Sequence, residues 1–468
     1  MRRSQHQPFG SASALQRSWQ RAPGLWGLWG LQGLAKRLRA RPQLALKLAL
    51  ALPLASSIAC QERCDETTSV AESEGDDHFE TPPGERLNVV VVVFESLRSR
   101  SATPYAPDLE TTPFLDSLAK GGVLVNTAYT VIPHTSKALV SIFCGLYPEI
   151  VKAVNEAEPG ALPRRCLAQS LSEGGYGTLF IQPARPSFEN RASMVERLGF
   201  EEFLGPDDLP RAGFDESSYF GYEDDIMLAP ALEWVDRQGE SPFFLAVLTL
   251  TPHHDYGVPV GFPSKPYVDD PTLNNYLNTV AYTDRFIGKL HAGLEDRGLL
   301  ENTIFVVSGD HGEGFGEHGR TQHDNVLWEE GLRVPLLLSG PGVGSPGMVI
   351  DGLRQTIDIV PTIASLLGLQ LNGHMPGLDL FETAGHERLF ASCWANDLCM
   401  AMLEGDRKAI YHYEERSPEV FDLTVDPLEQ TNILDEGDNR DFADDAIAAM
   451  LDWKTTTNTE YACAADER

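Results

Sequence analysis

Five consecutive valines followed by a phenylalanine, at residues 89–94, constrain the fold of this chain more than any other feature. A continuous β-branched and apolar run is typical of a strand that is buried on both faces of a parallel sheet. Similar runs occupy residues 243–250, 304–307 and 334–338. Helical patterns lie between them, at residues 112–119, 136–143, 228–237, 273–295 and 356–367. Strands that alternate with helices predict an α/β domain with a mostly parallel central sheet.

The pattern changes beyond about residue 385, where short strand-like runs follow one another at 389–393, 408–413 and 420–423. We therefore expect a catalytic domain over residues 86–385. A small antiparallel subdomain is expected over residues 386–468.

The first 60 residues differ sharply from the rest in charge. They hold nine of the 37 Lys and Arg residues and none of the 68 Asp and Glu residues. An apolar run at 44–59 follows the basic residues and ends in small side chains, which is typical of an export signal. Ser57 stands where a lipoprotein signal has an aliphatic residue, so lipid attachment at Cys60 and ordinary cleavage both remain open. Residues 61–85 are acidic and polar, as in a linker.

The rest of the chain, residues 61–468, is strongly acidic, with 28 basic against 68 acidic side chains. Such a surface repels a phosphate backbone, which argues against nucleic-acid binding. The sequence indicates no partner protein. Cys144 could pair with Cys166, and Cys393 with Cys399, or these could be buried free thiols. We predict an exported protein, periplasmic or extracellular, with a membrane tether through Cys60 as the lipid-anchored alternative.

Polar groups capable of chemistry follow two of the predicted strands. Glu95 and Ser96 end the first run, and Ser308-Gly309-Asp310-His311-Gly312 ends the third. Thr135 comes just before an apolar helix, where free N–H groups favour an anion. Function gathers at the carboxyl ends of parallel strands, and Glu, Asp, His and a hydroxyl suit a transition metal. The same groups could instead be structural caps.

Six segments in order resemble the sulfatase family of the alkaline phosphatase superfamily. They contain the opening strand, a "TPNLDxLA"-like helix, a second acidic strand end and the later "RVPL", "DIxPT" and "DPxE" signatures, at residues 88–98, 112–119, 308–319, 328–336, 358–362 and 421–429. The resemblance implies a three-layer sandwich with a mostly parallel central sheet and a small C-terminal antiparallel subdomain.

The chain departs from the sulfatase pattern at the nucleophile. Sulfatases carry Cys or Ser in C/S-x-P-x-R and oxidise it to formylglycine, whereas the matching position here is Thr135, with Lys137 and Leu139 at the Pro and Arg places. A threonine resembles the lipoteichoic acid synthase, phosphoglycerol transferase and phosphoethanolamine transferase branch. That resemblance implies one divalent metal ion held by Glu95, Thr135, Asp310 and His311. Zn or Mn suits this ligand set better than Ca or Mg.

Two further histidines match family positions. The resemblance places His253, with His254 as the less favoured choice, and His323 at the substrate anion or leaving group, with catalytic roles. Lys137 is expected either to contact the anion or to cap a helix turn.

The sequence therefore predicts a metal-dependent enzyme that hydrolyses or transfers a phosphate-type ester through Thr135. The substrate would be a small-molecule or cell-envelope phosphate or sulfate ester. Hydrolysis of sulfate esters without formylglycine is one alternative, and an anion-binding pseudoenzyme is another.

Overall fold

A computed structural model of the chain describes residues 77–79, 86–373, 375–382, 384–394, 398–413 and 415–466. The predicted export signal, with Cys60, and most of the predicted linker lie outside the described residues. Residues 78 and 79 differ from the linker prediction, because they form strand β1 (His78–Phe79) against β15 (Leu369–Gln370). Phe79 stacks on the Tyr176 ring with a centroid distance of 5.6 Å, which adds an apolar contact to that pairing.

The centre of the fold is an eight-stranded sheet in the order β13-β3-β12-β8-β2-β7-β5-β6. Among these strands only β12 runs antiparallel to its neighbours. The valine run forms β2 in the middle of the sheet, between β7 and β8, as its burial predicts. The bounds are Asn88–Phe94 for β2, Val123–Val125 for β3, Gly177–Ile181 for β5, Glu202–Leu204 for β6, Phe243–Leu248 for β7, Thr303–Gly309 for β8, Leu336–Ser339 for β12 and Met348–Ile350 for β13.

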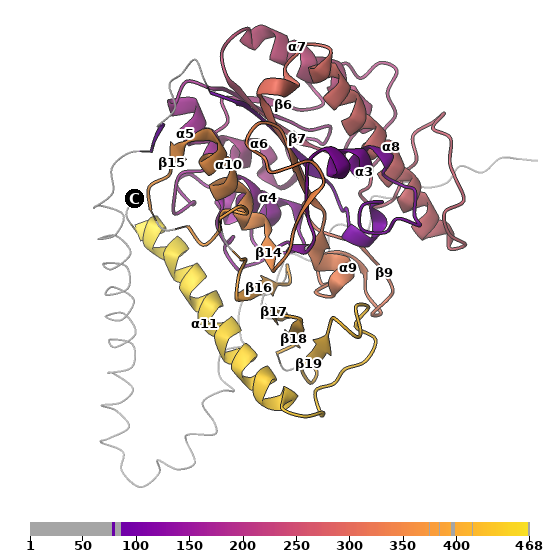
Figure 1. The fold of residues 1–468 in the computed structure, drawn as a ribbon, viewed down its shortest axis with the longest axis vertical. Coiled ribbons are helices and arrows are strands. Elements are labelled where there is room, and N and C mark those ends of the chain that lie inside the picture. Colours follow the sequence, from indigo (N-terminus) through magenta and orange to yellow (C-terminus); the bar gives the residue numbers. More distant parts are fainter. Residues whose placement is uncertain are drawn as a thin grey trace, which may run out of the picture. The chain divides into compact units, whose positions relative to one another are not determined.

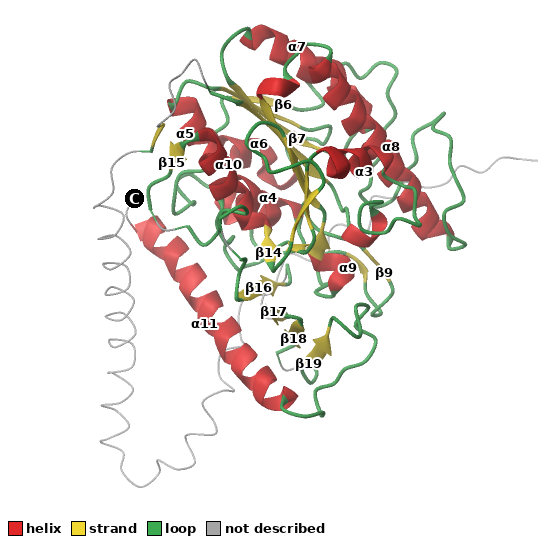
Figure 2. Cartoon of the chain, viewed as in Figure 1, coloured by secondary structure: helices red, strands yellow, loops and turns green. Residues whose placement is uncertain are grey.

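Helices cover both faces of this sheet (Figures 1 and 2). Val89, Val91 and Val93 belong to a core shared with α4, α5 and α10, whereas Val90, Val92 and Phe94 belong to a core shared with α3, α7 and α8. Successive strand residues point to opposite faces, so the unbroken apolar run supplies both cores. This three-layer α/β arrangement confirms the predicted fold class.

The predicted helices are present with small shifts at their ends. They are α3 (Pro113–Gly121), α4 (Thr135–Cys144), α7 (Leu228–Gln238), α8 (Pro271–Glu295) and α10 (Ile359–Leu367). The domain also contains α5 (Leu167–Glu173), α6 (Arg191–Arg197) and the short α9 (Glu329–Leu332). Asp270 caps α8 by accepting a hydrogen bond from the Leu273 N–H, and a proline occupies the first turn. Such a start is well suited to a helix because it satisfies a free N–H group and presets φ.

The predicted strand at 334–338 is divided by Pro335. Its first part forms β11 (Arg333–Val334) beside β4 (Ala128–Tyr129) in a separate small sheet with β14 (Arg354–Gln355). Its second part, β12, joins the central sheet. Proline has no N–H for a ladder, which is why the run does not continue as one strand.

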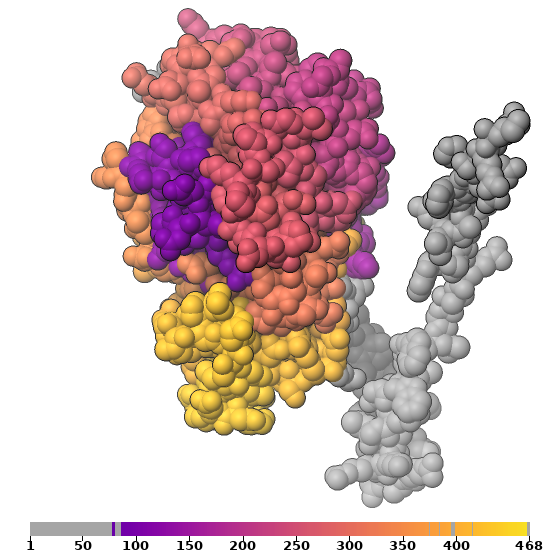
Figure 3. All heavy atoms as spheres, turned by 90° about the vertical axis from the view of Figure 1, so that its right-hand side faces the viewer, coloured from indigo at the N-terminus to yellow at the C-terminus, as the bar shows by residue number. Residues whose placement is uncertain are grey.

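The C-terminal region forms an antiparallel sheet, as predicted, with four strands where the sequence indicated three, and Figure 3 shows the C-terminal residues gathered in yellow. Its strands are β16 (Arg388–Ser392), β17 (Met400–Glu404), β18 (Arg407–Tyr411) and β19 (Glu419–Asp422). One face packs against the long helix α11 (Asn439–Asp466), through Met400 and Met402 of β17 and Ala446 and Met450 of the helix.

Cys144 is bonded to Cys166, and Cys393 to Cys399. The paired alternative therefore holds for these four cysteines. In the described part of the chain, no helix is both long enough and apolar enough to cross a membrane.

Candidate active site

The predicted metal ligands come from the ends of two neighbouring strands. Glu95 follows β2, and Asp310 and His311 follow β8. Phe94 and Gly309 are directly paired in the sheet, so the residues after them emerge side by side. The carboxyl ends of parallel strands thus bring together groups that are more than 200 positions apart in sequence.

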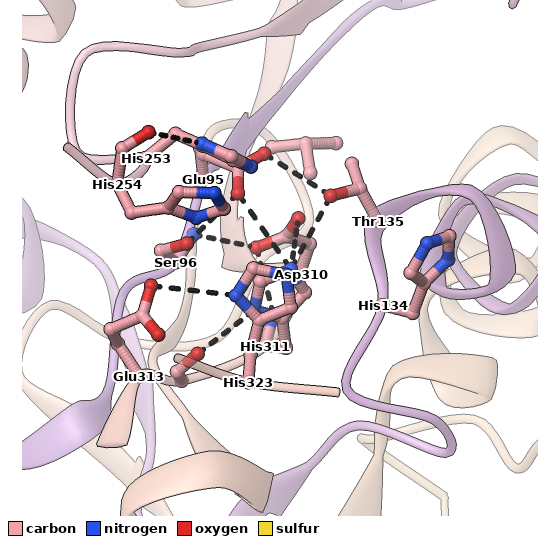
Figure 4. Close-up of polar contacts among 12 residues, drawn as sticks. Glu95, Ser96, His134, Thr135, His253, His254, Asp310, His311, Glu313 and His323 are labelled. Atoms are coloured by element: carbon pink, nitrogen blue, oxygen red, sulfur yellow. Dashed lines mark hydrogen bonds and ion pairs between the residues drawn. The ribbon is translucent and has the colours of Figure 1, made fainter. Parts of the chain in front are cut away.

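Thr135 reaches the same point from α4, of which it is the first residue. Its Oγ1 lies 3.3 Å from Glu95 Oε2 and 3.3 Å from His311 Nε2. His311 Nε2 also lies 3.3 Å from Asp310 Oδ2 (Figure 4). The four residues predicted as ligands of one metal ion therefore converge on a single point.

Hydrogen bonds orient these ligands. His311 Nδ1 donates to the Gly312 carbonyl at 2.8 Å, so the Nε2 lone pair is free to face the site. Asp310 Oδ1 accepts from the Ser96 and His311 backbone N–H groups, whereas Oδ2 is buried without a hydrogen-bond partner among the described residues. A buried carboxylate oxygen without a donor is costly unless a cation occupies the space in front of it.

The backbone around these ligands is tightly fixed. A Cβ atom on Gly312 would collide with the carbonyl oxygen of Glu330 in α9, so only glycine fits at this position. Ser96 has a φ of 55°, in the left-handed region, and from there its hydroxyl donates to Glu95 Oε1 at 2.9 Å. Strained backbone of this kind is common where a site must hold a set geometry.

The electrostatics also favour a cation. Burial raises the pKa of Glu95 well above its ordinary value, and the nearby carboxylate of Asp310 raises it further. Glu95, Asp310 and His311 offer ligand atoms that lie within 4.8 Å of one another. Two carboxylates, one imidazole and the Thr135 hydroxyl therefore fit a divalent metal ion, which would relieve the repulsion between the acids.

The predicted substrate histidines lie beside this cluster. His253 and His254 follow β7, and His323 follows a hairpin formed by β9 (Gly314–Phe315) and β10 (Thr321–Gln322). The His323 ring stacks on that of His311, with centroids 4.2 Å apart, and lies 5.8 Å from that of His253. The structure thus brings both predicted histidines to the site, together with His254.

The His253 imidazole is neutral in the free protein at neutral pH. Burial, together with the neighbouring His254, lowers the pKa of His253 to about 3. Its Nδ1 donates to the His254 carbonyl at 2.7 Å, which leaves a lone pair on Nε2. At neutral pH the unprotonated Nε2 of His253 can therefore accept a proton. A bound anion nearby would stabilise the protonated, positively charged imidazole.

Lys137 is not part of the site. Its side chain is fully buried, and Nζ contacts both carboxylate oxygens of Glu156, at 2.8 and 2.9 Å, and the Glu149 carbonyl at 3.0 Å. The expectation that Lys137 contacts the substrate anion is therefore wrong. Its ammonium group is held inside the protein by Glu156.

Arg191, the first residue of α6, lies beside the candidate site, and the sequence did not indicate this position. Its Nη2 donates to Ser136 Oγ at 3.1 Å, and its buried Nη1 has no hydrogen-bond partner among the described residues. Glu189 and Asn190, just before it, have φ values of 50° and 52°. This strained turn places a guanidinium close enough to affect Glu95 and Asp310, beside the start of α4, where an anion would bind.

Glu189 balances that charge. Burial opposes its ionisation, but hydrogen bonds from His134 and Ser136 prevail and lower its pKa to about 2. His134 Nε2 lies 3.0 Å from Glu189 Oε1, and Figure 4 shows His134 apart from the cluster of ligands. His134 therefore supports the turn before Arg191 from outside the cluster.

Fold and site together define the class of the protein: the sulfatase family model matches residues 87–369, more than half of the chain, and the chain belongs to that family. It is an enzyme of sulfatase-like type, a hydrolase or a phosphotransferase.

The similar proteins include both a sulfatase and a lipoteichoic acid synthase-like protein. An ulvan-active sulfatase of Formosa agariphila is 27% identical over 395 residues, which cover 74% of this chain and 77% of the relative. The lipoteichoic acid synthase-like YvgJ of Bacillus subtilis is 27% identical over 313 residues, 63% of this chain and 50% of the relative. A crystal structure of an alkaline phosphatase superfamily protein from Vibrio parahaemolyticus has a TM-score of 0.67 at 23% identity, and the match covers 86% of this chain and 97% of that one.

Proposed function

We propose that this protein is a metal-dependent enzyme that hydrolyses or transfers a phosphate-type ester, with Thr135 as its nucleophile. The observation that carries the proposal is the position of Thr135 Oγ1, 3.3 Å from both Glu95 Oε2 and His311 Nε2. A hydroxyl is a weak nucleophile until a metal ion or a base lowers its pKa, and the residues that would hold such a metal ion lie beside Thr135.

The bound metal ion would supply Lewis acidity, and Zn or Mn suits the ligands Glu95, Asp310 and His311. Thr135 Oγ1 forms a bond to phosphorus while the ester P–O bond to the leaving group breaks. The Thr135 proton passes to the departing oxygen, and His253 is our candidate to carry it because its Nε2 is unprotonated. Water or an alcohol then attacks phosphorus and the bond from phosphorus to Thr135 Oγ1 breaks. The proton of the attacking hydroxyl passes to Oγ1, which restores the threonine.

Positive charge for the substrate oxygens comes from Arg191. Its unpartnered Nη1 lies at the start of α4, beside the free N–H groups of the first helical turn. His323 is our second candidate for an anion contact, since it lies against His311. We expect a small-molecule or cell-envelope ester as substrate. The basic and apolar character of residues 1–60 supports an exported enzyme.

Sulfate-ester hydrolysis is the second candidate function. The ulvan-active sulfatase among the relatives favours it, since that match covers about three quarters of both chains. Against it stands Thr135, because no cysteine of this chain is followed by x-P-x-R and formylglycine cannot form from threonine.

Matched aryl phosphodiester, phosphomonoester and sulfate substrates separate the two functions. We expect the purified wild-type enzyme to prefer a phosphate-type ester. Thr135→Ala should reduce turnover on the order of 10³-fold or more, and Thr135→Ser should retain part of it. Thr130→Ala, which removes a buried hydroxyl bonded to a backbone carbonyl on the same stretch, is the matched control. A clear preference for the sulfate ester would favour the second candidate.

A further inference from the structure

We propose that Tyr219 determines specificity by binding the leaving group of the ester, and that this group is the ring of a neutral sugar. This role rests on the proposed function, in which Thr135 displaces that group. Tyr219 is 55% exposed, and it is the one aromatic side chain among the exposed large hydrophobic residues of the described part of the chain.

The geometry of phosphoryl transfer determines the side on which the leaving group departs. The attacking and leaving oxygens lie roughly in line through phosphorus. Figure 4 shows Thr135 on one side of Asp310 and His311, and His254 on the other side. A leaving group displaced by Thr135 therefore extends toward His254 and the residues beyond it.

Tyr219 is the outer end of a series of rings that begins at the ligands. The ring centroids of His311 and His323 are 4.2 Å apart, and those of His323 and His254 are 6.0 Å apart. The Tyr219 centroid lies 5.7 Å from that of His254. Exposure rises from 0% at His311 to 55% at Tyr219, so the series runs from the ligands to the surface on the side of the leaving group.

The backbone holds Tyr219 in this position. Tyr219 and Phe220 form the tip of a tight turn, which is closed by backbone hydrogen bonds in both directions between Ser218 and Gly221 at 3.4 Å. Phe220 is buried and stacks on Phe188 with a centroid distance of 4.4 Å, which anchors the tip. One aromatic ring of the turn therefore packs inside the protein, and the other is presented beside the site in a fixed position.

Two acidic side chains narrow the chemistry of the group that Tyr219 binds. Burial raises the pKa of the Tyr219 phenol, and the negative charges of Asp255 and Asp324 raise it further, which places both carboxylates near the ring. Ionised carboxylates accept hydrogen bonds and donate none, so they fit a ring that carries several hydroxyl groups.

The same carboxylates repel a uronate or a ring with further phosphate or sulfate groups. A small ammonium group would satisfy them but would leave most of the Tyr219 ring uncovered. Tyrosine offers a rigid flat face, which suits the CH groups of a sugar ring and loses little side-chain entropy on binding. A neutral sugar therefore matches the ring and the carboxylates together.

The test compares phosphate esters of four primary alcohols: glucose through its O6, benzyl alcohol, glycerol and ethanolamine. We expect the wild type to have its highest kcat/KM with the glucose ester. Tyr219→Ala should raise KM for that ester roughly tenfold, which is the effect of one aromatic contact. It should leave kcat nearly unchanged, because stacking stabilises the ground state and the transition state alike. The glycerol ester should be unaffected.

Two further variants control for a structural effect. Tyr219→Phe keeps the ring and should behave like the wild type. Tyr267→Ala removes a partly buried tyrosine whose hydroxyl donates to the Glu110 carbonyl at 3.5 Å, and it should leave the preference among the four esters unchanged.

An unchanged KM for the glucose ester in Tyr219→Ala would overturn the contact, and so would an equal rise for the glucose and glycerol esters. A wild type that prefers the benzyl, glycerol or ethanolamine ester would overturn the sugar assignment. Sulfate esters of the same alcohols give the same comparison if the wild type prefers sulfate, so failure of the phosphate-ester proposal is detected separately. A fully active Thr135→Ala alongside the expected rise in KM would overturn the proposed nucleophile and keep the Tyr219 contact.

Discussion

Replacing Lys137 with methionine would leave a buried carboxylate without its cation. The Lys137 and Glu156 side chains are both fully buried, and Nζ contacts both oxygens of the carboxylate. Methionine has a similar length and no charge, so it fills the space but cannot pair with Glu156.

The magnitude follows from that burial. Removing one partner of a buried ion pair costs about 3–5 kcal/mol, because the remaining charge is desolvated and unpaired. The double variant with Glu156→Gln should recover most of this loss, since the glutamine oxygen can still accept from the Glu149 N–H, which the carboxylate accepts at 3.1 Å. The pair should therefore show a coupling free energy of several kcal/mol in a double-mutant cycle.

The assay is urea unfolding of the four proteins of the cycle, together with kcat/KM of each folded enzyme. We expect a large loss of stability in Lys137→Met and a kcat/KM within a few-fold of wild type. A variant with wild-type stability and a hundred-fold lower kcat/KM would refute the reasoning, because it would put Lys137 at the substrate.

Three other predictions concern the ligands, the Arg191 turn and the disulfide next to α4. Asp310→Asn should lower the metal content and activity while the circular dichroism spectrum stays nearly unchanged; full metal occupancy with normal turnover would contradict the ligand assignment. The pKa of Glu189 is about 2, below its ordinary value of 4.5, so its ionised form adds stability that is complete above pH 4.5 and is lost as the pH falls toward 2. Urea unfolding at a series of pH values should thus show a steeper acid loss in wild type than in Glu189→Gln, and equal slopes would refute the pairing. Replacing Cys144 and Cys166 together with alanine should cost about 2–4 kcal/mol of unfolding free energy, since their bond closes a loop with a separation of 22 residues; an unchanged urea midpoint would argue against the bond.

The sequence predicted the central sheet because its strands are unusually clear. A strand such as residues 89–93 has to be buried on both faces, and helices between such strands impose parallel pairing. Helix α11 was not predicted, because its 28 residues bury only a narrow apolar stripe, through residues such as Ala446 and Met450, against the C-terminal sheet. So weak an apolar pattern does not predict a helix by itself, because packing against the sheet supplies most of the stability of such a helix.

The convergence of Glu95, Asp310 and His311 was predictable, because these residues follow strand ends and belong to family motifs. The position of Arg191 was not predictable, because an arginine after a polar loop has no local sequence signature. Only the strained turn before it directs its side chain toward the ligands. The prediction that Lys137 contacts the substrate anion failed for a different reason. The residues of α4 from Ser136 to Cys144 are all buried, so sequence spacing could not tell which side of the helix faces the ligands.

The central claim, that Thr135 attacks the ester, is tested most directly by trapping its covalent intermediate. The wild-type enzyme would be mixed with a slow phosphodiester, quenched in acid within the first turnover and digested for peptide mass spectrometry. We predict a phosphate-type adduct on the peptide that contains Thr135, assigned by fragmentation to that residue and absent from Thr135→Ala. An adduct on another side chain, or rapid turnover by Thr135→Ala, would contradict the account.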